Sequence, residues 1–425
     1  MRFCTASSAT PLPAHAPMQP TSTARRAALL AAPAPAARRR GPAAPCGVLP
    51  CLLLVLLCVA SPGRGPSALL RPAAAAPADF TRIEKEIAEE KAKAAKAWLG
   101  LALDLVALDL KDEATDAWRR ARDLVPEHPE LAAVESKVDA LAGKGVADEA
   151  VQKRIARTRE EVAKGYERMA KVLDKEQQDA RYTAWLVGAL ELSPTKARVT
   201  TLAKMAQAAP LLLQVEEKGF GGWLSLPKGW RAGNDIPLLV AFEGEGQMFQ
   251  QLLERFGRER KNESCALLAP LTLSSSTELK VDRYAPAYSE ALLKARNETR
   301  NAFDHEGVAR LVDLVRTHFA GSGPTWLAAQ GRGVEPALGY LALHPGKVAA
   351  ASLAQGRFES ADLPASEAPT SGGPPVELVG PAGGPEEPEG WLAARGFQKV
   401  AKAGLKGSGP TELAAQQWAW LVTPR

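Results

Sequence analysis

The sequence predicts an α/β fold, in which a mainly parallel sheet is flanked by helices and is preceded by an all-α domain of helical repeats. Two observations carry this prediction. From Asp79 to about Pro210 the chain is dense in strong helix formers and lacks strand-like alternation. After about Leu211 glycine and proline become more frequent, and short apolar runs alternate with helical stretches. This alternation favours right-handed crossovers and therefore a mainly parallel sheet.

Residues 1–78 differ from the rest of the chain, and we expect a signal or targeting segment within a low-complexity Ala/Pro region. They contain eight arginines and no Asp, Glu or Lys. The 13-residue apolar run from Val48 to Ala60 follows three arginines. It has the length of a signal-peptide core and is short for a membrane span. We therefore expect an exported protein, periplasmic or secreted. The alternative is a chain anchored in the membrane through an uncleaved Val48 to Ala60.

The basic charge of the whole chain comes from this segment. Removing its eight arginines from the 53 basic residues leaves 45, against 48 acidic residues, a net charge near −3. A nucleic-acid partner is therefore not expected. Four of the five cysteines lie at or before Cys58, so the fifth, Cys265, has no partner for a disulfide. We expect Cys265 to be a buried strand residue.

The helical segment, residues 79–215, carries a spaced pattern of large and small residues. The first copy comprises Trp98, Leu101, Ala102, Leu105, Ala114, Trp118, Ala121 and Pro126. A weaker second copy comprises Tyr166, Met169, Ala170, Leu173, Leu186, Ala189 and Pro194. These intervals resemble the tetratricopeptide repeat, a pair of antiparallel helices in 34 residues. The resemblance implies a domain that binds a protein or peptide, or braces its neighbour. The alternative is a plain helical hairpin or bundle.

Short apolar runs within residues 216–425 are predicted to be strands, and most of the intervals between them to be helices. The predicted strands are 220–227, 236–242, 265–273, 325–330, 348–354, 376–379 and 397–401. The predicted helices are 246–258, 284–300, 305–319, 333–343, 386–395 and 411–421. Because several runs are apolar throughout, we expect helices to cover both faces of the sheet.

The order of these elements resembles the α/β-hydrolase superfamily, particularly small secreted esterases and peptidase-like hydrolases. Residues 237–246 resemble the strand and loop that contribute to the oxyanion hole, and residues 326–344 resemble the nucleophile strand, elbow and following helix. Residues 376–380 resemble the strand before the acidic catalytic residue. The resemblance spans nearly all of 220–425 and implies hydrolysis of ester or peptide bonds by a Ser-His-Asp triad.

The residues that would perform this chemistry are missing. A vestigial nucleophile elbow, with glycine where serine is required, is formed by Ala329, Gly331, Arg332 and Gly333. A vestigial oxyanion loop is formed by Glu243, Gly244, Glu245 and Gly246. Its two carboxylates would oppose a developing negative charge. No histidine follows His344 and no aspartate follows Asp362, so the triad cannot be assembled in the chain order of this superfamily.

The run Asp304-His305-Glu306 is the most polar cluster that remains. We expect it at the start of a helix, with Asp304 as N-cap and His305 exposed. A metal or acid–base role for Glu243, Glu245 and His305 is an alternative, although no metal-ligand spacing supports it.

The sequence therefore predicts an exported, non-catalytic α/β-hydrolase-fold protein, a pseudoenzyme, that acts as a binding or scaffolding module. No catalytic residue, cofactor or metal is expected. Arg332, at the cleft that would hold the substrate in an active hydrolase, is available to bind an anionic group. A protein or peptide is expected to bind the helical domain, and the membrane is expected to be touched only through the N-terminal apolar run. The alternative is a serine-hydrolase-type esterase or peptidase with a relocated nucleophile. A third reading is a structural envelope protein that acts through its helical domain.

Overall fold

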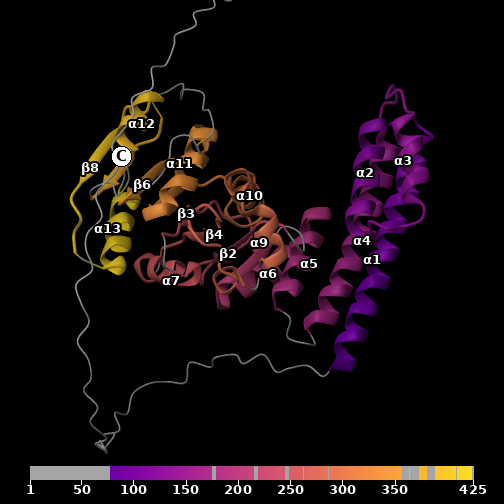
Figure 1. Ribbon diagram of the computed structural model, residues 1–425, viewed down its shortest axis with the longest axis horizontal. Coiled ribbons are helices and arrows are strands. Elements are labelled where there is room, and N and C mark those ends of the chain that lie inside the picture. The colour runs from indigo at the N-terminus through magenta and orange to yellow at the C-terminus, as the bar shows by residue number, and fades with distance from the viewer. Residues whose placement is uncertain are drawn as a thin grey trace, which may run out of the picture. The chain divides into compact units, whose positions relative to one another are not determined.

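The structure is a computed structural model (Figure 1) that describes residues 77–174, 179–214, 219–244, 248–261, 263–285, 287–356, 363, 373–380, 388–407 and 409–423. The apolar run Val48 to Ala60, on which the export prediction depends, lies outside these ranges. Among the helices of the described ranges, none is both long and apolar enough to cross a membrane.

Six helices come first along the described chain. They are α1 (Pro77–Val106), α2 (Lys111–Leu124), α3 (Leu131–Asp139), α4 (Glu149–Asp174), α5 (Asp179–Leu192) and α6 (Lys196–Ala208). Helix α1 packs along both α2 and α4, and α4 packs along α5. Most members of the spaced sequence pattern are buried where these helices meet, such as Trp98 and Ala114 in the first copy and Met169 in the second. That these helices form tetratricopeptide-like repeats stays a prediction.

The connection between α3 and α4 is tied back to the turn between α1 and α2. The side chain of Asp109, which has a φ of 54°, accepts hydrogen bonds from the backbone N–H groups of Gly143 and Lys144, both at 3.0 Å. A Cβ atom on Gly145 would lie 2.2 Å from the carbonyl oxygen of Leu108, so only glycine fits there. Gly143 and Gly145 therefore hold this connection against the turn between α1 and α2.

Helices α5 and α6 join the helical segment to the sheet. Side chains of α5 and α6, such as Val187 and Leu202, belong to the same apolar cluster as Leu213 and Leu224 of the first two strands. At the start of α6, Thr195 accepts a hydrogen bond from the N–H of Arg198, an N-cap of the usual kind. The guanidinium of Arg198 bonds Glu160 and Glu167 of α4, each at 2.8 Å. An apolar core thus joins α5 and α6 to the sheet, and partly exposed ion pairs connect α6 to α4.

The described strands form one eight-stranded sheet. They are β1 (Leu211–Gln214), β2 (Gly221–Ser225), β3 (Leu238–Phe242), β4 (Ala266–Pro270), β5 (Thr325–Gln330), β6 (Ala350–Ala354), β7 (Val376–Val379) and β8 (Val400–Ala403). Their order is β1-β2-β4-β3-β5-β6-β7-β8. Strand β2 runs antiparallel to β1 and β4, and the other pairings are parallel. The predicted mainly parallel sheet is confirmed and fits an α/β-hydrolase-like architecture. The prediction missed β1.

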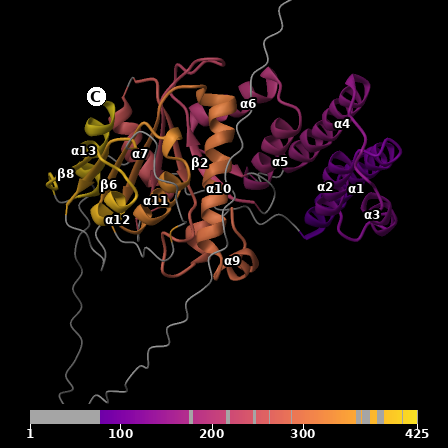
Figure 2. The ribbon, with the colours of Figure 1, turned by 90° about the horizontal axis from the view of Figure 1, so that it is seen from above.

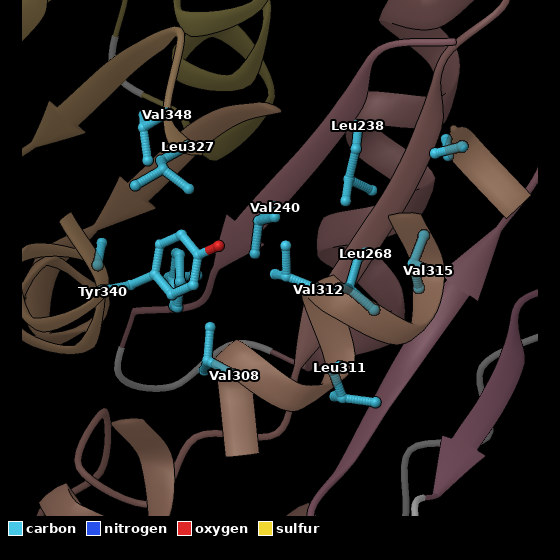
Figure 3. Packing of buried hydrophobic residues seen from close by; sticks show 14 of the residues in the cluster. Leu238, Val240, Leu268, Val308, Leu311, Val312, Val315, Leu327, Tyr340 and Val348 are labelled. Carbon is cyan, nitrogen blue, oxygen red and sulfur yellow. The ribbon is translucent and has the colours of Figure 1, made fainter. Parts of the chain in front are cut away.

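Helices cover both faces of the sheet (Figure 2). They are α7 (Phe249–Arg260), α8 (Val281–Tyr284), α9 (Glu290–Arg296), α10 (Arg300–Val315), α11 (Val334–Leu343), α12 (Pro388–Ala394) and α13 (Pro410–Val422). One apolar cluster contains side chains of α10, α11 and α12, and the other contains side chains of α7, α8, α9 and α13. Because side chains alternate along a strand, Val240 joins the first cluster and Leu239 the second. Figure 3 shows Leu238, Val240 and Leu268 facing α10 and Tyr340 of α11.

The structure corrects the prediction for the polar run at 304–306. Helix α10 begins at Arg300 rather than near residue 305, so Asp304 lies inside the helix and is not its N-cap. Its buried carboxylate accepts hydrogen bonds from the N–H groups of Leu273 and Ser274 and from the Ser274 hydroxyl. His305, expected to be exposed, is partly buried against α11. Asp304 therefore fixes the loop after β4, and the hydroxyl-rich sequence that follows this strand is part of that contact.

Candidate functional site

The strand order places a topological switch point between β3 and β5. From β3 the chain passes through α7 to β4 on one side, and it returns later to place β5 on the other side of β3. In open sheets of this kind, ligands bind in the crevice at the carboxyl ends of the strands where the order reverses. Phe242 and Ala329 are register partners near those ends. The residues after β3 and β5 thus form the candidate site.

The two predicted loops meet at this point through glycines. A Cβ atom on Gly333 would lie 2.6 Å from the carbonyl oxygen of Glu243, and one on Gly244 would lie 2.9 Å from that of Gln330. No real side chain tolerates such contacts with backbone, so both positions require glycine. The structure thus brings Gly333 against Glu243 and Gly244 against Gln330. Glu245 and Gly246 lie outside the described residues.

Gly331 occupies the sharp turn between β5 and α11. Its φ is 52°, in the left-handed region, and residues Gly331–Gly333 form one turn of 3₁₀-helix before α11 begins. A Cβ atom here would meet only the Cα of Gly244, at 3.7 Å. The turn therefore has space for a side chain but carries none. Ala329, predicted to be part of the elbow, lies within β5 and is fully buried.

Glu243 is the most unusual group of the site. Its side chain is fully buried, and neither carboxyl oxygen has a hydrogen-bond partner. Oε1 lies 3.4 Å from Nη2 of Arg283, which is itself only 11% exposed. Removal from water raises the pKa of Glu243 to about 8, although the charges of Arg283 and Arg255 oppose this rise. We expected a negative charge at this position, but burial favours the neutral acid at pH 7.

Arg283 reaches the site from α8 and was missed by sequence reasoning. Its guanidinium lies over the ring of Phe249, at 5.1 Å from the centroid, and its Nη2 donates to the carbonyl oxygen of Gly244 at 3.4 Å. Met248 and Val281, next to these groups in the chain, are 41% and 39% exposed. The site therefore contains a nearly buried arginine next to a buried carboxyl group, and the large apolar side chains of Met248 and Val281 are exposed beside them. Arg283 stands alone between two strands in the sequence and belongs to no spaced motif, so no sequence pattern identifies it.

A buried amide pair fixes the end of β5 from behind. The Gln330 side chain donates to Oε1 of Gln417 on α13 at 3.1 Å. Nε2 of Gln417 donates to the carbonyl oxygens of Ala329 at 3.1 Å and Ser352 at 2.9 Å. Sequence reasoning also missed Gln417. Its amide nitrogen thus donates to two buried carbonyl oxygens, and its oxygen accepts from the side chain of Gln330.

The structure brings none of the described histidines to the turn at Gly331. A Cβ atom on Gly339 would lie 2.2 Å from Nε2 of His305, so His305 packs roughly two helical turns beyond Gly331 along α11. His344 ends that helix, and His318 lies in the π-helical turn after α10. No group of three or more His, Cys, Asp and Glu side chains suited to a metal occurs among the residues that are described. The alternative of a metal or acid–base role for Glu243, Glu245 and His305 stays a prediction, because Glu245 lies outside the described residues.

A cavity of about 240 Å³ lies beside the switch point, at the carboxyl ends of β6, β7 and β8. Gln355 and Gly380, both with positive φ, line it after β6 and β7, and an ion pair of 2.5 Å joins Lys402 to Glu389 at its edge. The predicted position of the catalytic acid follows Gly380 and lies outside the described residues. Lys406, in the loop before α13, is exposed, and its N–H donates to Oε1 of Gln416.

Comparison with known proteins gives structural likeness without sequence matches. No family model and no curated protein matches the chain. The chain is similar to a cold-adapted esterase from an Arctic intertidal metagenomic library, with 12% identity, 50% of this chain and 91% of that one covered, and a TM-score of 0.34. It is similar to a carboxylesterase from Mesorhizobium loti, with 20% identity, coverage of 51% and 99%, and a TM-score of 0.32. It is also similar to an alpha-beta serine hydrolase homologue from Coxiella burnetii, with 11% identity, coverage of 49% and 95%, and a TM-score of 0.32.

Proposed function

We propose that residues 216–425 form a non-catalytic binding module of α/β-hydrolase-like fold, and that the switch point binds a ligand with an anionic group on an apolar body. The observation that carries the proposal is the turn at Gly331. It has the position and backbone of a nucleophile elbow but no side chain able to attack a carbonyl. The absence of any histidine after His344 supports the same reading.

The anionic part of the ligand follows from the charges at the site. Arg332 lies on the turn itself, where the N-terminus of the following helix also favours negative charge. Arg283 faces a carboxyl group that is mostly protonated at pH 7, so its positive charge is poorly compensated. The apolar part follows from the exposed side chains of Met248 and Val281. A carboxylate at the end of an alkyl chain has both properties.

Export is also part of the proposal. The apolar run Val48 to Ala60 and the small residues around Ala76 support a cleaved signal. N-terminal sequencing of the protein recovered from its producing cells tests this: a new N-terminus near Asp79 is expected, and an intact residue 1 in a membrane fraction would support the anchored alternative.

Catalysis is tested first, with the full chain. A fluorophosphonate probe and a panel of short and long acyl esters are expected to give no labelled serine and no turnover above buffer. The variant Gly331→Ser is expected to stay inactive as well, because none of the histidines that the structure describes lies at the turn. Covalent labelling of a serine between residues 220 and 425 in the unmodified protein would overturn the binding module and favour a hydrolase with a relocated nucleophile.

Binding is tested by calorimetry with decanoate, decan-1-ol and decylamine as probes. We expect decanoate to bind at least about tenfold more tightly than the alcohol, since a charged hydrogen-bonded contact contributes about 1.5–3 kcal/mol. Arg332→Gln is expected to remove most of that preference. Arg258→Gln, an exposed arginine on α7, serves as the matched control and should leave it unchanged. Equal affinity for all three probes would contradict the anionic site.

A further inference from the structure

The carboxyl group of Glu243 and the guanidinium of Arg283 form an unusual pair at the switch point. Both side chains are removed from water, with 0% and 11% of their surfaces exposed. Among the residues that the structure describes, neither oxygen of Glu243 has a hydrogen-bond partner, and Nε of Arg283 also lacks one. Oε1 of Glu243 lies 3.4 Å from Nη2 of Arg283. The two groups are therefore close enough to attract each other when both are charged, but they share no short hydrogen bond.

The elements around Glu243 carry a small set of other titratable or charged groups. They are Arg255 of α7, Arg283 and Tyr284 of α8, Arg332 of the turn after β5, and Glu335 of α11. The positive charges of Arg283 and Arg255 both act on the Glu243 carboxyl. The hydroxyl of Tyr284 keeps its proton at neutral pH, since burial raises its pKa to about 12. Within the described ranges, the ion pair of Glu243 is with Arg283.

The ability of Arg283 to attract an anion depends on the state of Glu243. While the carboxyl carries a proton, the guanidinium donates a hydrogen bond of 3.4 Å to the carbonyl oxygen of Gly244 and lies 5.1 Å from the ring centroid of Phe249. Neither neighbour neutralises its charge, so an anion is attracted to it. Once the carboxyl is ionised, its own negative charge neutralises Arg283. The pair thus has one state that attracts an anion and one that does not.

A bound anion and an ionised Glu243 exclude each other. Both would lie beside the same guanidinium, in a site where little water remains to screen their repulsion. When two negative groups share such a site, one of them is neutralised by a proton. The proton goes to Glu243, because no hydrogen-bond donor of the described residues stabilises its charge, whereas the charge of the ligand is stabilised by its contact with Arg283.

We propose that the switch point binds its anionic ligand together with a proton, and that Glu243 is the group that holds this proton. At low pH Glu243 already carries the proton, so the ligand binds directly. At high pH the ionised carboxylate takes one proton from the solvent as the ligand enters, and the ligand replaces it as the partner of Arg283. The inference rests on the proposed function of the switch point, and it adds control of ligand binding by pH.

The pH range of this coupling follows from the pKa of Glu243, which removal from water raises to about 8 against the opposing charges of Arg283 and Arg255. Below about pH 7 the acid is protonated with or without ligand, so the affinity does not change with pH. Above about pH 8 most of the free protein has to take up a proton on binding, so the affinity falls as pH rises. Between pH 7 and pH 9 the dissociation constant should therefore rise about tenfold.

The experiment is calorimetry on the full chain with decanoate, which stays ionised throughout this range. Titrations at one pH in two buffers of different ionisation enthalpy, Tris and HEPES, give the number of protons taken up with each ligand molecule. We expect about 0.1 proton at pH 7 and about 0.5 proton at pH 8, where half of the free Glu243 is ionised. Decan-1-ol carries no charge and should bind without proton uptake at either pH.

Two variants identify the group that takes up the proton. Glu243→Gln keeps the size of the side chain and cannot ionise, so proton uptake should disappear and the dissociation constant should stay within about twofold between pH 7 and pH 9. Glu254→Gln removes an exposed carboxyl of α7 and should retain both the proton uptake and the about tenfold rise of the parent. The proton count of the unmodified protein does not depend on either variant, so it tests the coupling even where Glu243→Gln fails to fold.

Three results would contradict the proposal in different ways. Binding of decanoate without proton uptake at pH 8, and with constant affinity from pH 7 to pH 9, would overturn the proton coupling and leave the anionic site in place. Proton uptake that persists in Glu243→Gln would overturn the assignment of the proton to Glu243. No binding of decanoate at any pH would overturn the proposed function of the switch point, and the proton coupling with it.

Discussion

Replacing Glu243 by glutamine tests the buried acid at the switch point. Glutamine keeps the size of the side chain and cannot ionise. In the parent protein the carboxyl is fully buried, has no hydrogen-bond partner and is close to Arg283. The variant therefore removes only the titration of this group, and it leaves the packing between β3 and β5 intact.

The expected magnitude follows from the pKa of Glu243, which burial raises from 4.5 to about 8. Between these values the folded protein retains a proton that the unfolded chain releases. The free energy of unfolding therefore falls as pH rises above about 4.5, and it stops falling above about pH 8, where both states are ionised. At about 1.4 kcal/mol for each pH unit, Glu243 lowers the stability by about 3 kcal/mol between pH 5 and pH 8.

Urea unfolding followed by circular dichroism at several pH values between 5 and 8.5 measures this effect. We expect Glu243→Gln to be about 3 kcal/mol more stable than the parent at pH 8 and nearly equal to it at pH 5. Burial also raises the pKa of Asp304 to about 7, so part of the pH dependence remains in the variant. Glu254→Gln, an exposed position on α7, is the control and should follow the parent. Parallel pH curves for the parent and Glu243→Gln would refute a proton-retaining Glu243.

Three further experiments, two with substitutions and one with a thiol reagent, test other parts of the structure. Gly333→Ala should lower the free energy of unfolding in urea by about 3 kcal/mol or more, because its Cβ would lie 2.6 Å from a backbone carbonyl oxygen. Gly331→Ala should lower it by only about 1–2 kcal/mol, because its φ is positive but its Cβ has space. Equal losses of stability would contradict the described turn. Arg198→Gln should lower stability by about 1 kcal/mol at pH 7, because water screens the partly exposed carboxylate of Glu160. The loss should be much smaller near pH 2, because the ion pair lowers the pKa of Glu160 to about 2; a pH-independent loss would contradict the pairing. Burial raises the pKa of Cys265 to about 12, so a disulfide reagent should label this thiol only after unfolding, and rapid labelling of the folded protein would contradict its burial.

The sequence predicted most of the sheet because its strands are continuous apolar runs. The predicted runs 325–330 and 376–379 coincide with β5 and β7, and 236–242 contains β3. Burial on both faces gives such a signal without any alternation of polar residues. The strand β1 was missed because Leu211–Gln214 is only four residues long and follows directly on helical sequence. In a segment this short, pairing with β2 decides the conformation rather than local preference.

The candidate site was predicted less completely, for a physical reason. Gly244 and Gly333 were predicted as site residues because the chain order of the elements places both loops at one edge of the sheet. Arg283 and Gln417 were not found, because each reaches the site across many residues and neither belongs to a spaced motif. Asp304 was assigned to a helix start from its local sequence alone, whereas its partners lie about 30 residues earlier. Long-range hydrogen bonds leave no periodic signal in the sequence.

The turn at Gly331 keeps its shape for reasons that do not involve catalysis. Gly333 and Gly244 are required because the backbones of β3 and β5 approach each other closely, and the amide of Gln417 holds the end of β5 in place. None of these contacts involves a side chain at position 331, where a Cβ has room. A strand-to-helix turn of this kind is thus stable without a nucleophile. The geometry of an elbow therefore gives no evidence of hydrolysis by itself, and the function has to be inferred from the side chains around the turn. Here these are two arginines and a buried acid that favours its neutral form, and it is on these groups that the proposal of an anionic ligand depends.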